Sequence, residues 1–226
     1  MAQALNGFCP DKRILTALYR RLHAAYGPQQ WWPADTPFEV AVGAVLTQNT
    51  AWSNVEKAIF NLRSAGVLAP EAILQLPPGE LADLVRPSGY FNIKAERLRQ
   101  LSRCVLDCGG IAGCGKLDTP TLRARLLGVK GVGPETADDI LLYAFDRPVF
   151  VIDTYTRRLL QRHRLATGDE PYEVLRAGFE RALPSQATLL GEYHALIVVH
   201  AKASCRKVPA CAGCAIRPDC PGRSPD

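Results

Sequence analysis

The sequence predicts an all-α protein, and three observations lead to that fold class. Apolar residues recur every three or four positions through nearly the whole chain, which is the spacing of one face of an amphipathic helix. Glycine and proline interrupt this pattern at short intervals, so we expect the helices to be joined by short loops. Residues 149–152 read as a strand, but because no second segment can pair with them we expect a buried connector.

The expected helices follow one another along the chain. The first buries one apolar face and ends at Gly27, which is followed by Pro28. That face consists of Ile14, Leu15, Leu18 and Leu22. The other helices are expected at 38–46, 55–62, a short stretch from 70, 78–85, 93–106, 119–127, 135–145, 154–163, 172–183 and 186–202. The glycine-rich stretch 109–115 is expected to be a turn, because a phosphate-binding loop would need a strand before it.

Composition and charge exclude several classes of protein. The 226 residues, 47% of them hydrophobic and 22% charged, exclude a disordered, collagen-like or coiled-coil chain. The longest apolar run near the C-terminal end, 195–199, is too short to span a membrane, and no secretory signal is visible. We therefore expect a cytoplasmic protein, or a nuclear or organellar one in a eukaryote. The formal charge of +5 is small, so any nucleic-acid surface has to come from local clustering.

Four of the eight cysteines lie in a C-terminal segment that is too poor in apolar side chains to form its own core. They are Cys205, Cys211, Cys214 and Cys220, in the pattern C-x5-C-x2-C-x5-C. Disulfides are not expected in a reducing compartment, so the four thiolates are candidates to bind one inorganic centre. A [4Fe–4S] cluster and tetrahedral zinc both take four cysteines, and the single central C-x2-C pair favours the cluster.

Basic side chains accompany this cysteine segment. Arg206 and Lys207 directly follow its first cysteine, where they would present positive charge to a phosphate group. The remaining cysteines lack a fourth ligand nearby in the sequence and are expected to be core or surface thiols: Cys9, Cys104, Cys108 and Cys114.

A glycine-rich hairpin is expected between two helices at residues 126–137, which read L-L-G-V-K-G-V-G-P-E-T-A. Gly131 and Gly133 permit backbone angles closed to other residues, and Val132 between them can point inward. The free N–H groups that begin the next helix can bind a phosphate, with Lys130 beside them. By itself the segment is either a tight interhelical turn or a phosphate site.

The hairpin resembles the helix–hairpin–helix motif of the endonuclease III (HhH-GPD) superfamily of DNA glycosylases, whose pattern is L-P-G-V-G-x-K-T-A. Residues 151–154, V-I-D-T, are similar to the V-D-T element that carries the catalytic aspartate of that superfamily, here Asp153. The C-terminal cysteines resemble its [4Fe–4S] loop, although the commoner first spacing is x6 and not x5. The resemblance implies a two-lobed helical fold. A six-helix domain at 32–148 would end in the hairpin, and a discontinuous domain, 1–31 plus 149–226, would carry the cluster loop.

One departure from the superfamily changes the expected chemistry. Where bifunctional members have a lysine that attacks the sugar, this sequence has Glu135, and a carboxylate cannot form the Schiff base that strand cleavage needs. Lys130 lies on the other side of the hairpin and is a poor substitute. We therefore predict a monofunctional DNA glycosylase whose AP lyase activity is absent or weak.

The N-terminal half more closely resembles the MagIII-type 3-methyladenine DNA glycosylases, through residues 31–50 and 85–95. That branch also has glutamate at the Glu135 position, and some of its members carry the cluster. The resemblance implies an aromatic pocket for the damaged base. Its residues are Trp31, Trp32, Trp52 and, at the edge, Lys202. A methylated purine is a cation, and aromatic faces attract cations.

Two further residues match positions that distort DNA in the superfamily. Gln48 resembles the plug that fills the gap left by the flipped base, and Tyr90 resembles the wedge in the opposite strand. Asp153 would then stabilise the cationic sugar and orient the attacking water. The predicted function is excision of alkylated purines such as 3-methyladenine from double-stranded DNA in base excision repair. We expect a nucleoid-associated monomer that needs neither a protein partner nor a membrane.

Other interpretations of these residues stay open. The chain could act on oxidised pyrimidines or mismatched uracil or thymine, bind DNA without catalysis, or carry zinc in place of the cluster. Trp52 could belong to the core, and Lys202 could be a solvated helix end. Asp153 could serve as a helix N-cap, for which Thr154 is the other candidate. The basic residues that follow are expected to form a solvated helix face: Arg157, Arg158, Arg162, His163 and Arg164.

Overall fold

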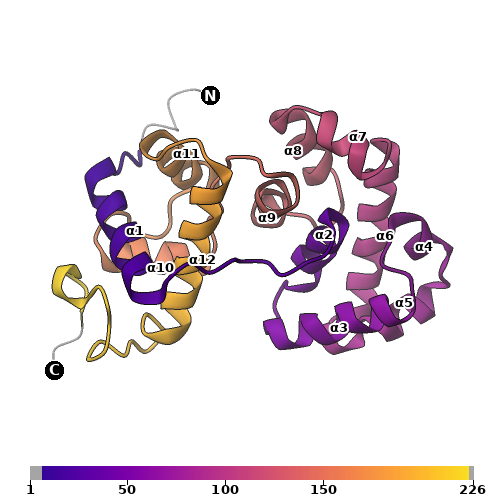
Figure 1. Cartoon of the computed structure of the whole chain (residues 1–226), viewed down its shortest axis with the longest axis horizontal. Helices are drawn as coiled ribbons and strands as arrows, with labels where there is room; N and C mark the ends of the chain where they lie inside the picture. Colours follow the sequence, from indigo (N-terminus) through magenta and orange to yellow (C-terminus); the bar gives the residue numbers. More distant parts are fainter. Residues whose placement is uncertain (1–6, 224–226) are drawn as a thin grey trace. The chain divides into compact units, whose positions relative to one another are not determined.

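The computed structural model describes residues 7–223, and over this range it is built of helices and contains no strand (Figure 1). The all-α prediction is confirmed for these residues. The elements are α1 (Lys12–Tyr26), α2 (Pro37–Leu46), α3 (Trp52–Ser64), α4 (Pro70–Gln75), α5 (Pro78–Leu84), η2 (Arg86–Ser88), α6 (Phe91–Asp107), α7 (Gly110–Lys116), α8 (Thr119–Leu127), α9 (Pro134–Phe145), α10 (Thr154–Arg162), α11 (Tyr172–Ala182), α12 (Ala187–Ala203) and η3 (Arg217–Asp219). Residues 149–152 form the expected buried connector. Within the described range, no helix combines the length and apolar character that crossing a membrane requires.

The chain divides into two compact units. Residues Trp32–Arg147 form one, which we call the hairpin unit, and Met1–Trp31 with Pro148–Asp226 form the other, the cysteine unit. The hairpin unit contains η2 and the eight α-helices α2 to α9. The resemblance implied six helices here and the apolar pattern predicted seven; the additional helix is α7. The described part of the cysteine unit contains α1, α10, α11, α12 and η3.

Helix α2 is the centre of the hairpin unit. Every residue from Phe38 to Leu46 is buried, and a helix that is apolar on nearly all sides is stable only inside a core. It packs against α3, α6 and α9. Thr36 caps its start, because the Thr36 hydroxyl oxygen accepts a hydrogen bond from the Glu39 N–H at 3.1 Å. Because α2 packs against three helices, its C-terminal end is held in place, and so is the start of the loop that follows Leu46.

The glycine-rich stretch was expected to be a turn, and this prediction was wrong. Residues Gly110–Lys116 form helix α7. Gly109 and Gly110 adopt positive φ angles of 85° and 76°, which lets the chain leave α6 and begin a new helix. Cys114 on this helix is 1% exposed, so tertiary burial of that face outweighs the low helix propensity of glycine.

Helix α12 forms the core of the cysteine unit and packs against α1 and α10. Phe150 of the connector stacks on Phe179 of α11 with 3.9 Å between ring centroids, and Tyr193 of α12 meets Phe150 edge-on. On α1 the predicted apolar face is buried except for Ile14, which is 44% exposed. Beyond α12, residues 204–223 contain no regular structure other than η3.

Candidate active site

The hairpin between α8 and α9 is held by its own backbone and by two buried valines. The Val129 N–H donates to the Leu126 carbonyl at 3.0 Å, and the Val132 N–H donates to the Val129 carbonyl at 2.9 Å. Both valines are 6% exposed, so Val132 points inward as predicted. Gly131 has a φ of 90°, and the side chain of Arg97 from α6 lies so close over it that an added Cβ would collide with that side chain. Any other residue would therefore be strained at this position.

Gln48, the expected plug, lies against this hairpin. Its Nε2 donates to the Gly131 carbonyl at 3.1 Å and to the Thr136 hydroxyl at 2.9 Å. Its Oε1 accepts a hydrogen bond from Arg97. The structure thus brings the plug position and the hairpin together through Arg97 and Thr136, two partners that no sequence pattern signalled. Entry into a duplex would require Gln48 to leave these partners.

Tyr90, the expected wedge, is an exposed aromatic residue in a left-handed backbone conformation. Tyr90 is 68% exposed and has a φ of 46°. Gly89 before it also has a positive φ, of 68°. An exposed aromatic residue held in a costly backbone conformation is typical of a functional position. The geometry is compatible with the predicted role.

Trp32 and Trp52 form an aromatic group in the hairpin unit, and Tyr143 of α9 completes it. The Trp32 ring lies edge-on to Trp52 with 5.6 Å between centroids, and 5.1 Å from the Tyr143 centroid. Trp32 has a φ of 70°, and its Nε1 is buried without a hydrogen-bond partner among the described residues. Backbone strain and an unsatisfied buried donor both mark candidate binding sites. Tyr143 was missed because its helix showed only an apolar pattern.

Trp31 and Lys202 meet in the cysteine unit. The Lys202 Nζ lies 5.7 Å from the centroid of the Trp31 ring, within the range of a cation–π contact. Trp31 ends the N-terminal segment of this unit, whereas Trp32 begins the hairpin unit. The two adjacent tryptophans therefore belong to different units.

Asp153 is the N-cap of α10, so Thr154 is not the cap. Its Oδ1 accepts a hydrogen bond from the Thr156 N–H at 2.6 Å, and its Oδ2 lies 3.6 Å from Nε2 of His194. Asp153 is 8% exposed. Burial raises the pKa of this carboxyl, but His194 and Thr156 favour the charged form and hold the pKa below its ordinary value. The result is a buried carboxylate that is ionised at neutral pH.

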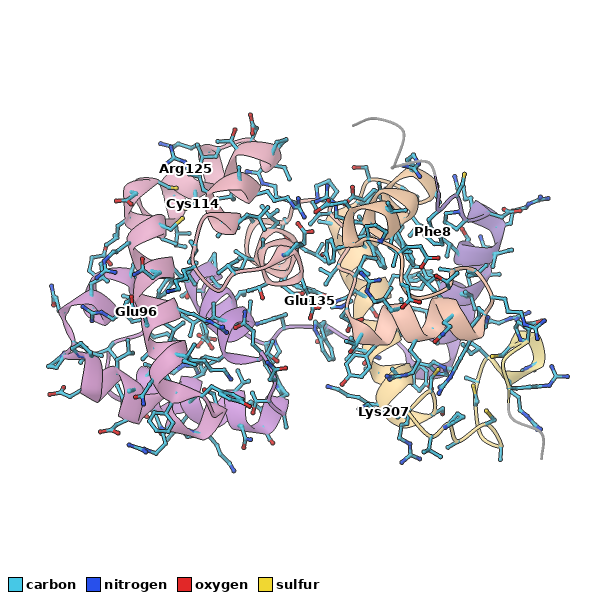
Figure 2. The ribbon with its side chains drawn as sticks, turned by 180° about the vertical axis from the view of Figure 1, so that it is seen from behind. Phe8, Glu96, Cys114, Arg125, Glu135 and Lys207 are labelled. Carbon is cyan, nitrogen blue, oxygen red and sulfur yellow. The ribbon has the colours of Figure 1, made fainter. Side chains whose placement is uncertain are left out.

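Glu135 is exposed in the first turn of α9, directly after Pro134 (Figure 2). The helix dipole favours a negative charge at this end. The position therefore offers a stable carboxylate where a lyase would need an amine. Lys130 of the hairpin and Arg206 and Lys207 of the C-terminal segment are also exposed, so each is accessible to a phosphate group.

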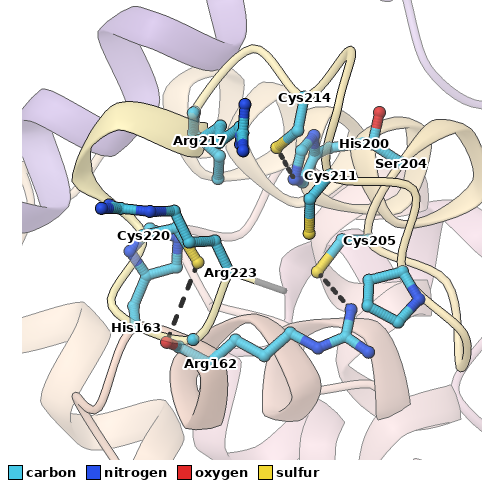
Figure 3. A pocket seen from close by; sticks show the side chains of 13 residues that line it. Arg162, His163, His200, Ser204, Cys205, Cys211, Cys214, Arg217, Cys220 and Arg223 are labelled. Carbon is cyan, nitrogen blue, oxygen red and sulfur yellow. Dashed lines mark hydrogen bonds between the residues drawn. The ribbon is translucent and has the colours of Figure 1, made fainter. Parts of the chain in front are cut away.

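The four C-terminal cysteines line one cavity (Figure 3). Burial raises the pKa of Cys214 and Cys220, which keeps these thiols protonated unless a cation displaces the proton. As the side chains stand in residues 7–223, no three metal-binding groups lie close enough together to hold a metal ion. The donor set nonetheless fits a [4Fe–4S] cluster or zinc, because all four cysteines line the same pocket.

Two arginines of α10 were expected to face solvent, but they bind the C-terminal cysteine segment. Arg158 donates to the Cys205 carbonyl at 2.7 Å. Arg162 donates to the carbonyls of Arg206 and Lys207 at 2.7 and 3.1 Å, and its Nη1 lies 3.0 Å from the Cys205 Sγ. An amphipathic pattern cannot reveal these contacts, because their acceptors are mostly backbone carbonyls far along the chain.

The rest of the predicted solvated face is also mostly engaged. Arg157 donates to the carbonyls of Gly168 and Glu170 at 3.0 and 2.7 Å. His163 is 9% exposed, and burial lowers its pKa to about 4. Of the five residues assigned to this face, Arg164 is exposed as predicted.

Three further cysteines gather where α6 meets α7. The Cys104 Sγ lies 3.6 Å from the Arg125 carbonyl, and the Cys114 Sγ lies 3.9 Å from the Val105 carbonyl. Burial is the largest cause that raises the pKa of Cys104 to about 11 and that of Cys114 to about 12. Thiols with such pKa values stay protonated and are poor nucleophiles. They behave as packed thiols, whereas Cys9 is exposed.

Comparison with known proteins finds relatives of this chain and solved structures with a similar fold. The family described as HhH-GPD superfamily base excision DNA repair protein matches residues 42–185. A candidate DNA repair glycosylase of Methanocaldococcus jannaschii is 45% identical over 210 residues, which cover 92% of this chain and 96% of that protein.

Solved structures with the same fold include two DNA repair enzymes. The H. pylori 3-methyladenine DNA glycosylase (MagIII), bound to 1,N6-ethenoadenine, is 32% identical with a TM-score of 0.73 and covers 85% of this chain and 97% of its own. An endonuclease III–DNA complex is 20% identical with a TM-score of 0.79 and covers 93% and 95% of the two chains. The second likeness shows the fold alone.

Proposed function

The chain belongs to the HhH-GPD superfamily of base excision DNA repair proteins, and we propose that it removes alkylated purines such as 3-methyladenine from duplex DNA. Membership of the family makes it a DNA-binding N-glycosylase. The choice of base rests on the aromatic group formed by Trp32, Trp52 and Tyr143. The likeness to the H. pylori 3-methyladenine DNA glycosylase supports the same class of base.

The aromatic residues suit a cationic base. A purine methylated on N3 or N7 carries a positive charge and gains about 0.5–2 kcal/mol over a neutral base when it stacks on an aromatic face. The Trp31 ring already attracts the ammonium group of Lys202. The buried Nε1–H of Trp32, which has no partner among the described residues, would be satisfied by an acceptor atom of the bound base.

Asp153 is the proposed catalytic carboxylate. As the glycosidic bond breaks, its electron pair leaves with the base and a positive charge develops on the sugar. A buried carboxylate stabilises that charge and orients or deprotonates the water whose oxygen bonds to C1′. Because Glu135 stands where a lyase has its lysine, AP lyase activity is expected to be absent or weak. The expected product is an unbroken strand with an abasic site.

The DNA contacts follow from the exposed basic and intercalating residues. Lys130 and the backbone of Gly131–Gly133 would bind phosphates from the hairpin, and Arg206 and Lys207 would bind them from the C-terminal segment. Gln48 and Tyr90 would fill and wedge the duplex around the flipped base.

We also propose that the cysteine cavity holds a [4Fe–4S] cluster, with Cys205, Cys211, Cys214 and Cys220 as ligands. When bound, the cluster supplies the cross-link that a segment without its own core lacks. The purified protein should then be brown and contain iron. A colourless protein with stoichiometric zinc would replace the cluster with a zinc site.

Base release from duplexes that carry 3-methyladenine, 7-methylguanine, thymine glycol or uracil tests the substrate. We expect release of the two methylpurines. Release of thymine glycol or uracil without release of methylpurines would contradict the proposal and favour a glycosylase for oxidised pyrimidines or mismatched bases. Lesion binding with no release of any base would favour a non-catalytic DNA-binding protein.

Asp153→Asn tests the catalytic residue. Asparagine caps helices as well as aspartate does, so the fold should survive, whereas base release should fall at least about 100-fold with lesion binding intact. Asp118→Asn is the matched control, because Asp118 caps α8 through the Thr121 N–H in the same way. Equal activity of both variants would refute the assignment of Asp153.

A further inference from the structure

Lys94 of α6 is a buried lysine that the chemistry above does not use. It is 1% exposed, and its Nζ donates to the Leu46 carbonyl at 2.8 Å and to the Ser88 carbonyl at 2.6 Å. A buried ammonium group is costly unless acceptors surround it. Burial, together with the charge of Arg97, lowers the pKa of Lys94 to about 8. A group kept in so unfavourable a place needs an explanation beyond packing.

Both carbonyls lie at the ends of helical segments. Leu46 is the last residue of α2, and Ser88 is the last residue of η2. The final carbonyls of a helix have no partner within the helix, and a cation near that end is favoured by the helix dipole. One ammonium group therefore completes two helix ends that are far apart in the sequence.

Each of these helix ends leads directly to a side chain that is expected to enter DNA. Gln48 lies two positions after Leu46, and Tyr90 lies two positions after Ser88. The backbone N–H of Lys94 also donates to the Tyr90 carbonyl at 2.9 Å. Lys94 thus contacts the start of both loops. The backbone that leads to Gln48 and the backbone that leads to Tyr90 are hydrogen-bonded to the same residue.

We propose that Lys94 is a positioning residue that sets the separation of Gln48 and Tyr90, so that both enter the duplex together. The inference rests on the roles assigned to Gln48 and Tyr90 in the proposed function. Flipping a base costs a few kcal/mol of lost stacking and pairing, and side chains that fill the gap and contact the orphaned base together offset part of that cost. A misplacement of about 1 Å can cost about 100-fold in rate. The geometry set by Lys94 therefore matters most where a base pair has to be opened.

The test compares Lys94→Met with a matched variant on the same helix. Arg99 also completes helix-end carbonyls with its cation, because its Nη1 donates to the carbonyls of Ile73 and Leu76 at 3.2 and 2.8 Å. These carbonyls belong to the end of α4, which carries neither the plug nor the wedge. Arg99→Met therefore removes a comparable anchor and leaves the two loops in place.

Two readouts separate positioning from stability. The first is the fluorescence of 2-aminopurine opposite a tetrahydrofuran abasic analogue, which reports insertion whatever base the enzyme excises. The second is single-turnover release of the same lesion from a normal duplex and from a duplex with an abasic site opposite the lesion. We expect Lys94→Met to lower the insertion signal and release from the normal duplex about tenfold. Release from the other duplex should fall less than about twofold, since no base pair is opened there.

Equal losses in Lys94→Met and Arg99→Met, or equal losses on the two duplexes, would overturn the proposal. If Lys94→Met does not fold, Lys94→Gln takes its place, because glutamine keeps two N–H donors on a shorter side chain. Lys94→Gln should then lower the insertion signal and release from the normal duplex in the same pattern, by a smaller factor than Lys94→Met. Insertion by the unmodified protein without release of methylpurines would overturn the proposed substrate, while the comparison of Lys94 with Arg99 by fluorescence would still decide the role of Lys94.

Discussion

The hairpin at residues 128–133 and the C-terminal segment 204–223 are both irregular and basic, yet different forces hold them in shape. The hairpin closes through hydrogen bonds between neighbouring residues and buries Val129 and Val132. Apart from two of its cysteines, the C-terminal segment buries one apolar side chain, Ile216, while Val208 is 84% exposed. It is fastened instead by side chains from other elements.

The hairpin is thus held mainly by local contacts, whereas the C-terminal segment is held by side chains from other helices. Arg158 and Arg162 reach the C-terminal segment from α10, and Arg21 of α1 pairs with Asp219. Most hydrogen bonds that close the hairpin join residues close in sequence, and Gln48 adds one distant bond to the Gly131 carbonyl. The C-terminal segment needs the rest of its unit and, in our proposal, a cofactor. A substitution that disrupts one of the two segments should therefore leave the structure of the other unchanged.

Loss of the cofactor should give the largest separation between them. Cys214→Ser removes one of the four proposed ligands, and the free energy of binding a structural metal centre adds directly to the free energy of folding. We expect the colour and iron to be lost and residues 204–223 to become sensitive to protease, while the hairpin unit stays folded. Visible absorption, metal analysis and limited proteolysis measure this. Cys9→Ser, at an exposed thiol outside the segment, is the control. Protease resistance of the iron-free variant would show that the arginines alone hold the segment.

Gly131→Ala should break the hairpin and leave the C-terminal segment unchanged. A Cβ at φ 90° is strained and would lie 2.8 Å from Cδ of Arg97, so we expect a loss of about 1–3 kcal/mol in the free energy of unfolding. Gly133→Ala is the matched control, since Gly133 has a φ of −92° and nothing lies within 4 Å of its added Cβ. Urea unfolding and DNA affinity measure both variants. Equal stabilities would contradict the role of Gly131.

Arg162→Met should loosen the C-terminal segment without touching the hairpin. The variant loses donors to the carbonyls of Arg206 and Lys207, and bonds to charged groups contribute about 1.5–3 kcal/mol each, less where solvent reaches them. We expect proteolysis of the segment to speed up severalfold while iron content stays unchanged. Arg164→Met, at the exposed neighbour, should have no effect. Identical proteolysis of the two variants would show that Arg162 does not hold the segment.

The smallest effect is expected from single phosphate contacts. Lys130→Met on the hairpin and Lys207→Met on the C-terminal segment should each lower the salt dependence of DNA binding, log Kd against log salt, by about 0.9. Lys12→Met, an exposed lysine of α1, is the control. A change for Lys130 alone would mean that only the hairpin binds DNA.

Much of the site was predictable because its signals are local. The turn at Gly131–Gly133, the carboxylate at Glu135 and the spacing of the four cysteines depend on residues near one another in the sequence. The helix at Gly110–Lys116 was missed, because glycine favours a turn by itself and the burial of Cys114 comes from the fold. Sequence reasoning erred where tertiary packing outweighed local preference.

The sequence by itself determined the all-α class, the hairpin, and the residues that mark the family. The tertiary structure decided which distant groups meet: Lys94 with two helix ends, Arg97 with Gln48, Tyr143 with Trp32, and His194 with Asp153. Periodicity and turn chemistry depend on neighbouring residues and can be read along the chain. The acceptors of a buried cation or the partners of a ring depend on which elements pack together, and no local pattern specifies that.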